Sequence, residues 1–192
     1  MKLKHKDIGF CMTGSFYTLK NTIIQIKELI KEEANVIPIM SYTAYNIDTK
    51  LGKAKDYINE IEAITGKKIV HTIKSAEPIG SKNMTDIMII APCTGNTLGK
   101  LSLGICDSPV LMASKSHLSY LKPLVIAIST KDGLSGSAEN IGRLLNRNNY
   151  FFVPFRQNNP ITKPCSLCFD PKYIKKTLEY ALDKEQIQPI LL

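Results

Sequence analysis

The stretch IMIIAPCTGNTLGKLSLGICD, residues 87–107, indicates the fold of this chain. It opens with an uninterrupted apolar run, Ile87–Ala91, which is typical of a strand buried on both faces of a parallel sheet. A proline, a cysteine and several small polar residues follow, and a helical pattern begins near Asn96. The stretch therefore predicts a strand–turn–helix unit of an α/β fold, with a polar turn at the carboxyl end of the strand.

The same alternation of strands and helices continues on both sides of this unit. Short apolar runs predict strands at Asp7–Met12, Asn35–Met40, Ile69–Ile73, Thr85–Ala91, Leu124–Ser129 and Tyr150–Val153. Amphipathic spacing predicts helices at Phe16–Glu33, Lys50–Ile64, Asn96–Leu103, Val110–Leu121, Ser135–Asn146 and Pro171–Leu182. The Pro-rich stretch 154–168 is predicted to be a loop. Together these elements predict a three-layer, doubly wound α/β fold with a mostly parallel six-stranded sheet, in one domain spanning residues 1–192.

Composition narrows the functional classes. With 44% hydrophobic and 22% charged residues, the chain has the composition of a soluble globular protein. No apolar run approaches the ~20 residues that span a bilayer, and the N-terminus does not resemble a signal peptide, so a cytoplasmic protein without membrane attachment is expected. The net charge is +8, but the lysines are scattered without an arginine-rich arm. This pattern favours small anionic ligands, such as a dicarboxylate or a phosphate, over nucleic acid.

The five cysteines predict neither a disulfide framework nor a metal site. Their number is odd, and the expected compartment is reducing. Cys165 and Cys168 form a lone C-x-x-C, and no second pair or nearby histidine completes a zinc site. We interpret them as ordinary thiols, with a redox role as the alternative.

Small polar residues follow three of the predicted strands. Thr13, Gly14 and Ser15 follow the first strand, Ser41 follows the second, and the turn 92–97 follows the fourth. A turn that opens a helix offers free N–H groups to an anion, although Ser15 is also a good helix cap, and both interpretations remain open. Neutral donors in such number suit a flat heterocycle with one phosphate, and neither the dinucleotide nor the triphosphate signature is present.

Two resemblances extend this interpretation. APCTGNTLGKLSLGICD is similar to the signature A-P-x-[ST]-[AG]-N-T-x-x-K-x-x-x-G-x-x-D of the FMN-binding flavoprotein family, which includes phosphopantothenoylcysteine decarboxylases. The TGS turn, residues 13–15, is similar to the phosphate-binding first turn of that family. The chain also resembles the B-subunit family of dipicolinate synthases over nearly its whole length. The stretches that carry this resemblance are residues 76–118, LVIAISTKDGLSGSAENIGRLLN, YFFVPFRQNNPITKPCSL and the tail QIQPIL. The resemblance implies a Rossmann-like flavoprotein fold.

The resemblance also implies an FMN site. The loop Pro92–Thr97 is expected to wrap the flavin through backbone N–H groups and side chains, with Gly95 allowing a close approach. Gly14 and Ser15 are expected to hold the ribityl phosphate, with Ser41 bonding nearby. The full set of expected cofactor-binding residues is Thr13, Gly14, Ser15, Ser41, Pro92, Thr94, Gly95, Asn96, Thr97 and Ser129. Helix capping is the alternative for Asn96 and Thr97.

Two residues are candidates for catalysis. His71 occupies the place where the decarboxylase branch carries a catalytic histidine, although a lone histidine on an apolar strand is commonly structural. The P-A-M-N clamp of the decarboxylases is replaced here by ISTKDGLSG, residues 128–136, which makes cysteine decarboxylation doubtful. Lys131, within that stretch, or Lys115 is expected to attract a dicarboxylate, with a solvated loop lysine as the alternative for each.

The implied activity is the oxidation of dihydrodipicolinate to dipicolinate in the cytoplasm of the mother cell of a spore-forming bacterium. The expected partners are the A-subunit of dipicolinate synthase, which is a dehydrogenase that carries NADP, a small dicarboxylate substrate and further copies of the chain. Removal of a hydride and a proton makes the pyridine ring aromatic, so the protein mainly has to orient the ring and accept electrons through a cofactor. The alternatives are an FMN-dependent decarboxylase and a non-catalytic protein that stabilises the dehydrogenase.

Overall fold

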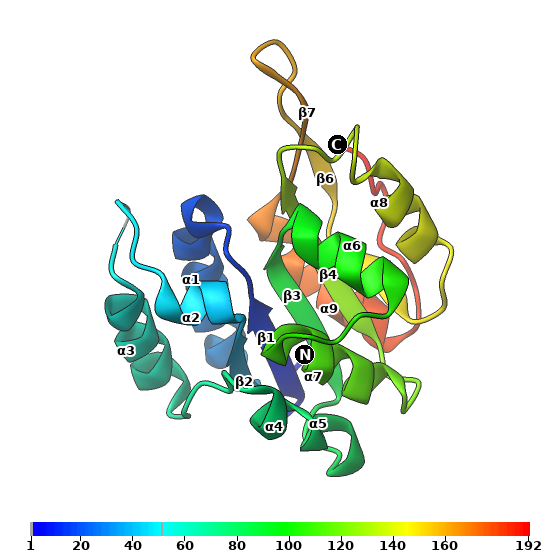
Figure 1. The fold of residues 1–192 in the computed structure, drawn as a ribbon. Helices are drawn as coiled ribbons and strands as arrows, with labels where there is room; N and C mark the ends of the chain where they lie inside the picture. Colours follow the sequence, from blue (N-terminus) through cyan, green and yellow to red (C-terminus); the bar gives the residue numbers. More distant parts are fainter. Residues whose placement is uncertain (1, 51) are drawn as a thin grey trace.

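A mostly parallel sheet forms the centre of the fold (Figure 1) in the computed structural model, which describes residues 2–50 and 52–192. Within those residues the sheet has seven strands: β1 (Asp7–Met12), β2 (Asn35–Met40), β3 (Ile87–Cys93), β4 (Leu124–Thr130), β5 (Tyr150–Phe152), β6 (Phe155–Asn159) and β7 (Lys163–Phe169). Their order is β2-β1-β3-β4-β7-β6, and β5 also pairs with β4. The fold class predicted from the sequence is confirmed.

The outer edge of β4 is shared between two neighbours. β5 runs parallel beside Leu124–Ile126, whereas β7 pairs antiparallel with Ser129 and Thr130. The carboxyl end of β4 therefore lies against the base of the β6–β7 hairpin, which projects from the body of the molecule in Figure 1.

Helices cover both faces of the sheet, as three layers require. One face packs against α1 (Phe16–Lys31), α3 (Ala54–Thr65) and α9 (Ile174–Leu182). The other packs against α4 (Ile73–Ala76), α5 (Pro78–Ser81), α6 (Gly95–Leu103), α7 (Pro109–Leu118) and α8 (Ala138–Leu145). A short helix, α2 (Tyr42–Asn46), follows β2. Side chains of β3 alternate between the two cores, Ile87 and Ile89 in the first and Met88 and Ile90 in the second, so both faces of this strand are buried.

The predicted strand at Ile69–Ile73 is wrong. Only Val70 joins the sheet, through an isolated parallel bridge to Ile39. The chain then turns into α4, because Thr72 and Ser75 bond to each other's backbone N–H in a reciprocal cap. This capping chemistry overrides the weak β pattern of a short apolar run.

The predicted loop at residues 154–168 is also wrong, since it forms the β6–β7 hairpin and brings the sheet from six strands to seven. Pro160 lies at the turn of the hairpin, and Pro164 lies near the start of β7. Four of the five β6 residues are exposed, so the strand has no apolar alternation by which the sequence could reveal it.

Among the described helices, none combines the length and the apolar character that a membrane span requires.

Candidate functional site

The polar turns converge at one edge of the sheet. β2, β1, β3 and β4 are neighbours and run parallel, so the segments that follow them lie side by side. The strand order reverses between β1 and β3, where open α/β sheets bind ligands. A cavity of about 340 Å³ lies there. Its lining residues are Thr13, Gly14, Ser41, Tyr42, Thr43, Thr94, Asn96, Thr97, Lys100, Asp107, Ser108 and Leu111.

Thr13 ties the first turn to the third. Its buried hydroxyl donates to the carbonyl of Pro92 over 2.7 Å and accepts from the backbone N–H of Thr94 over 3.2 Å. Both bonds cross between the β1 and β3 ends, which lie about 80 residues apart in the sequence. The Thr13 side chain therefore fixes the spacing of the two turns that form the floor of the cavity.

The Ser15 side chain does not cap α1. Its hydroxyl lies 2.9 Å from the Ser129 hydroxyl and accepts from the Thr18 hydroxyl, also over 2.9 Å. The first turn of the 16-residue α1 therefore has no side-chain cap, and its N–H groups and helix dipole favour an anion. The structure thereby brings together Ser15 and Ser129, which the sequence assigns to one site. Of the predicted cofactor-binding residues, these two, Pro92 and Gly95 do not line the cavity, so a binding role for them stays a prediction.

Ser41 and Thr94 act as helix caps at the wall of the cavity. Ser41 Oγ accepts from the N–H of Ala44 over 3.2 Å at the start of α2, and Thr94 Oγ1 accepts from the N–H of Thr97 over 3.4 Å at the start of α6. The Thr94 and Thr97 hydroxyls also lie 3.1 Å apart. The exposed side chain of Asn96, in contrast, has no hydrogen-bond partner in the described part of the chain, so its amide is free for a ligand.

Gly95 packs closely against the end of β4 and the segment that follows it. A Cβ at this position would lie 2.6 Å from Thr130 Oγ1 and 2.8 Å from both Asp132 Oδ1 and Ser137 Oγ. The structure thus gives Gly95 a packing reason to be glycine, besides the approach of a ring that the sequence predicts. The hydroxyls of Thr130 and Ser137 donate to the Asp132 carboxylate and lower the pKa of that carboxyl.

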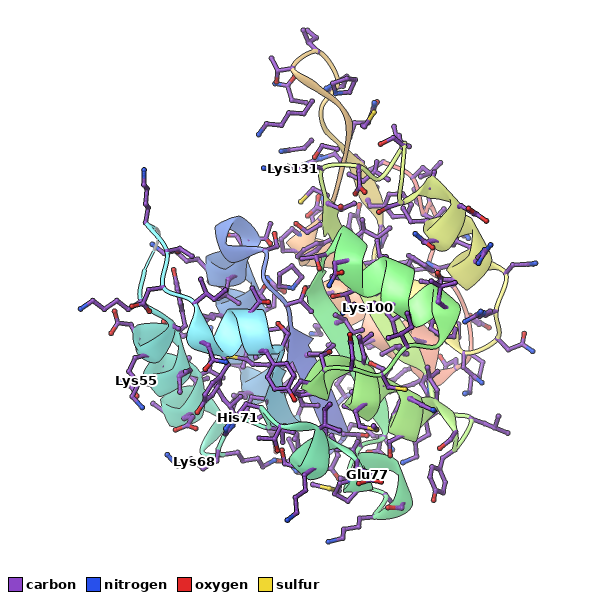
Figure 2. The ribbon with its side chains drawn as sticks, in the orientation of Figure 1. Lys55, Lys68, His71, Glu77, Lys100 and Lys131 are labelled. Carbon is purple, nitrogen blue, oxygen red and sulfur yellow. The ribbon has the colours of Figure 1, made fainter. Side chains whose placement is uncertain are left out.

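Lys100 and Asp107 are lining residues that sequence reasoning left out of the site. Lys100 Nζ lies 2.6 Å from Asp107 Oδ2, so the two residues join α6 to the segment before α7 at the cavity wall. Figure 2 labels Lys100 on α6. Both occupy fixed positions of the N-T-x-x-K-x-x-x-G-x-x-D pattern, which was the signal that could have identified them. Thr43 belongs to the polar residues that follow the second strand, which is a weaker signal. Tyr42, Ser108 and Leu111 carry no comparable signal, because only the tertiary structure brings α2 and α7 to the cavity.

Comparison with known proteins supports the family resemblance that the sequence motifs indicate. The flavoprotein family model matches residues 1–170. The B-subunit of dipicolinate synthase from Bacillus subtilis (strain 168) is 40% identical over 190 residues, which cover 99% of this chain and 95% of that protein. The crystal structure of the B-subunit of dipicolinate synthase from Bacillus halodurans C superposes with a TM-score of 0.92 and 41% identity, over 100% of this chain and 98% of that one.

The chain belongs to the B-subunit family of dipicolinate synthases, within the flavoproteins.

A more distant structure shows how far the fold extends beyond this B-subunit family. The FMN-dependent cysteine decarboxylase SpaF superposes with a TM-score of 0.68 and 17% identity, over 96% of this chain and 98% of that one. At this identity the comparison shows the fold alone.

The two predicted catalytic residues lie outside the cavity of this B-subunit family member. His71 stacks on Tyr45 of α2, with ring centroids 4.0 Å apart, and its Nδ1 lies 3.1 Å from the carbonyl of Ile69. Lys131 is exposed near the base of the β6–β7 hairpin (Figure 2). Neither lines the cavity within one copy of the chain, so a catalytic role for either residue stays a prediction.

The cysteines are free throughout the described part of this flavoprotein chain. Burial raises the pKa of the Cys11 and Cys93 thiols, so both remain protonated and unreactive at neutral pH. Cys165 and Cys168 both lie on β7. Among residues 2–50 and 52–192, no cluster of three or more His, Cys, Asp or Glu side chains could hold a metal ion.

Proposed function

We propose that this chain supplies an FMN pocket to a dipicolinate synthase that oxidises dihydrodipicolinate to dipicolinate. The observation that carries the proposal is the cavity at the β1–β3 switch point. Its lining reaches Gly14, two residues before the uncapped helix α1, and otherwise consists mainly of hydroxyl and amide groups with the ion pair Lys100–Asp107. Membership of the flavoprotein family and the FMN dependence of SpaF support the choice of cofactor. The name of the Bacillus subtilis relative supports the choice of reaction.

The residues of the cavity fit FMN by their chemistry. Gly14 and Ser15 precede α1, whose free N–H groups and dipole suit a ribityl phosphate. The amide of Asn96 has no partner within the described chain and is suited to the polar edge of a flavin ring. A volume of about 340 Å³ falls within the range for small-molecule sites.

When bound, FMN would supply a two-electron acceptor for the hydride that the dihydropyridine loses, and NADP on the partner dehydrogenase would be the final acceptor of those two electrons. The role of the chain is then to hold FMN and to orient it. Thr13 fixes the two turns of the cavity floor, and the α1 N-terminus anchors the phosphate. The remaining parts of the proposal are a partner dehydrogenase that uses NADP (the A-subunit), an assembly of several copies of this chain, and action in the cytoplasm of the mother cell of a spore former.

The direct test is the visible absorption spectrum of the purified protein, titrated with FMN. We expect a flavin band that shifts from its free position on binding, with saturation at one FMN per chain. Addition of the partner dehydrogenase, NADP and dihydrodipicolinate is then expected to form dipicolinate at a higher rate than the dehydrogenase and NADP without this chain. Release of CO₂ from a cysteinyl substrate would instead favour the decarboxylase alternative. A protein that takes up no FMN yet raises the activity of the dehydrogenase would favour the alternative of a non-catalytic, stabilising protein.

Ser15→Asp is expected to weaken FMN binding by about tenfold or more without loss of stability, because a carboxylate at the α1 N-terminus caps the helix but repels a phosphate. Ser15→Asn is the matched control, since it has the same shape and capping ability without the charge. The measurement is a fluorescence titration of each variant with FMN and with riboflavin, which lacks the phosphate. If riboflavin and FMN are weakened equally, the phosphate does not bind at α1.

A further inference from the structure

Lys100 brings a positive charge to the cavity wall. Of the cavity-lining residues that the structure describes, it is the one that is cationic, and the others offer hydroxyls, an amide, backbone groups and the carboxylate of Asp107. A pyridine dicarboxylate carries two negative charges, and Asp107 is the other charged group among the described lining residues, so binding depends on the ammonium group of Lys100. Lys131, which the sequence proposes for this role, lies outside the cavity.

The partner of Lys100 is one that a ligand can replace. The Lys100 side chain is 31% exposed and that of Asp107 is 52% exposed, so water reaches both groups and the pair contributes little to stability. Breaking it leaves no buried charge, because Asp107 can turn into solvent. A carboxylate that enters the cavity therefore exchanges for Asp107 at low cost.

Two uncharged residues beside the pair complete a site for an aromatic acid. The Thr43 hydroxyl is free of partners within the described chain, whereas Ser108 is occupied in capping α7 through the N–H of Leu111. Leu111 adds an apolar surface. A charged contact, a hydroxyl and an apolar surface are the arrangement that orients a small polar ring.

We propose that Lys100 binds a carboxylate of the pyridine dicarboxylate, and that Asp107 is the internal anion it releases on binding. The inference rests on the proposed function, because it takes its substrate class from there. It assigns to Lys100 the recognition of substrate and product, and to Asp107 a competing role that limits their affinity.

The test is calorimetric titration of dipicolinate, the stable product, into the FMN-treated protein and into the untreated protein. Lys100→Gln is expected to weaken dipicolinate binding by about tenfold or more, because a charge-assisted hydrogen bond is lost. Asp107→Asn is expected to strengthen it several-fold, because the competing carboxylate is gone. The opposite signs matter, since a purely structural ion pair would make both variants bind more weakly.

Controls separate this inference from its alternatives. Lys27 Nζ and Glu60 Oε1 form another half-exposed ion pair, 2.8 Å apart, between α1 and α3. Lys27→Gln and Glu60→Gln are expected to leave dipicolinate binding unchanged. Picolinate, with one carboxylate fewer, is expected to bind more weakly than dipicolinate to the parent protein.

Several outcomes would overturn the inference. They are unchanged dipicolinate affinity in Lys100→Gln, weaker binding in Asp107→Asn, and absence of dipicolinate binding to the parent protein in both forms. A loss of FMN affinity in Lys100→Gln with dipicolinate affinity intact would assign the lysine to the phosphate, and would also contradict it. FMN binding is read separately from the flavin absorption band, so failure of the FMN proposal is distinguishable from failure of this one.

Discussion

Gly80→Ala is expected to destabilise the protein by about 3 kcal/mol, at the upper part of the usual range for overpacking. A Cβ at Gly80 would lie 2.0 Å from the backbone oxygen of Ser116 and 2.6 Å from its carbonyl carbon. Backbone atoms of α7 cannot rotate away as the end of a side chain can, so α5 and α7 must separate. The separation also breaks the bond that the Gly80 N–H donates to Ser116 Oγ over 2.9 Å.

The loss of stability is measured by urea unfolding of Gly80→Ala, with Gly142→Ala as the control variant. Gly142 is exposed within α8 and has open space where its Cβ would lie, so alanine there is expected to stabilise by about 0.5–1 kcal/mol. Two alanine substitutions in helices thus have opposite expected signs. An unchanged unfolding midpoint for Gly80→Ala would contradict the close packing of α5 on α7.

Acidification from pH 7 to pH 5 is expected to cost about 2 kcal/mol of stability through His117 alone. The His117 ring is fully buried, and its Nε2–H donates to the carbonyl of Pro123 over 3.0 Å while Nδ1 accepts from the Thr85 hydroxyl over 2.8 Å. Burial lowers the pKa of His117 from 6.5 to about 4. The neutral ring is therefore the form that the fold requires.

The sign follows from the two pKa values. Above pH 6.5 the histidine is neutral in both the folded and the unfolded chain, so it gives no pH dependence. Between 6.5 and about 4 the unfolded chain binds a proton that the folded chain does not, and stability falls as the pH falls. Below about 4 the folded chain is protonated as well, and the loss from this residue is complete.

His117→Gln tests this assignment. Glutamine does not titrate, so the variant is expected to begin less stable at pH 7 and to lose about 2 kcal/mol less than the parent between pH 7 and pH 5. His5→Asn is the control, because His5 is exposed and has a left-handed backbone, with φ of 60°, that asparagine tolerates. Equal pH slopes for the parent and His117→Gln would rule out His117 as the source of acid sensitivity.

The strands of the central sheet were predictable because a strand buried on both faces needs apolar residues at consecutive positions, and such a run is visible in the sequence. β1 and β2 have the predicted bounds, and β3 and β4 differ from theirs by two residues or fewer at each end. The β6–β7 hairpin was not predictable, because its exposed residues have no apolar period. The short α2, α4 and α5 were not predictable either, since four or five residues give too few turns for a helical pattern.

The candidate site was predictable in its location and less so in its details. Polar turns after parallel strands must lie at one sheet edge, and Thr13, Ser41 and Asn96 do line one cavity there. Whether Ser15 caps α1 depended on the Ser129 hydroxyl, which lies 114 residues further along the chain. A choice between a local and a distant partner cannot be read from the residues beside Ser15.

The order of residues by itself determined the α/β class and the edge of the sheet that holds the polar turns, because both depend on local periodicity and on the parallel direction of the strands. Tertiary structure alone decided which of those groups remain free. The side chains of Thr13, Ser15 and Thr94 form hydrogen bonds within the protein, whereas Asn96 has no partner in the described chain. Lys100 lines the cavity, and His71 and Lys131 lie outside it. The physical reason is that a hydroxyl or an ammonium group bonds to whatever lies within about 3 Å, and distant segments set that neighbourhood only after folding.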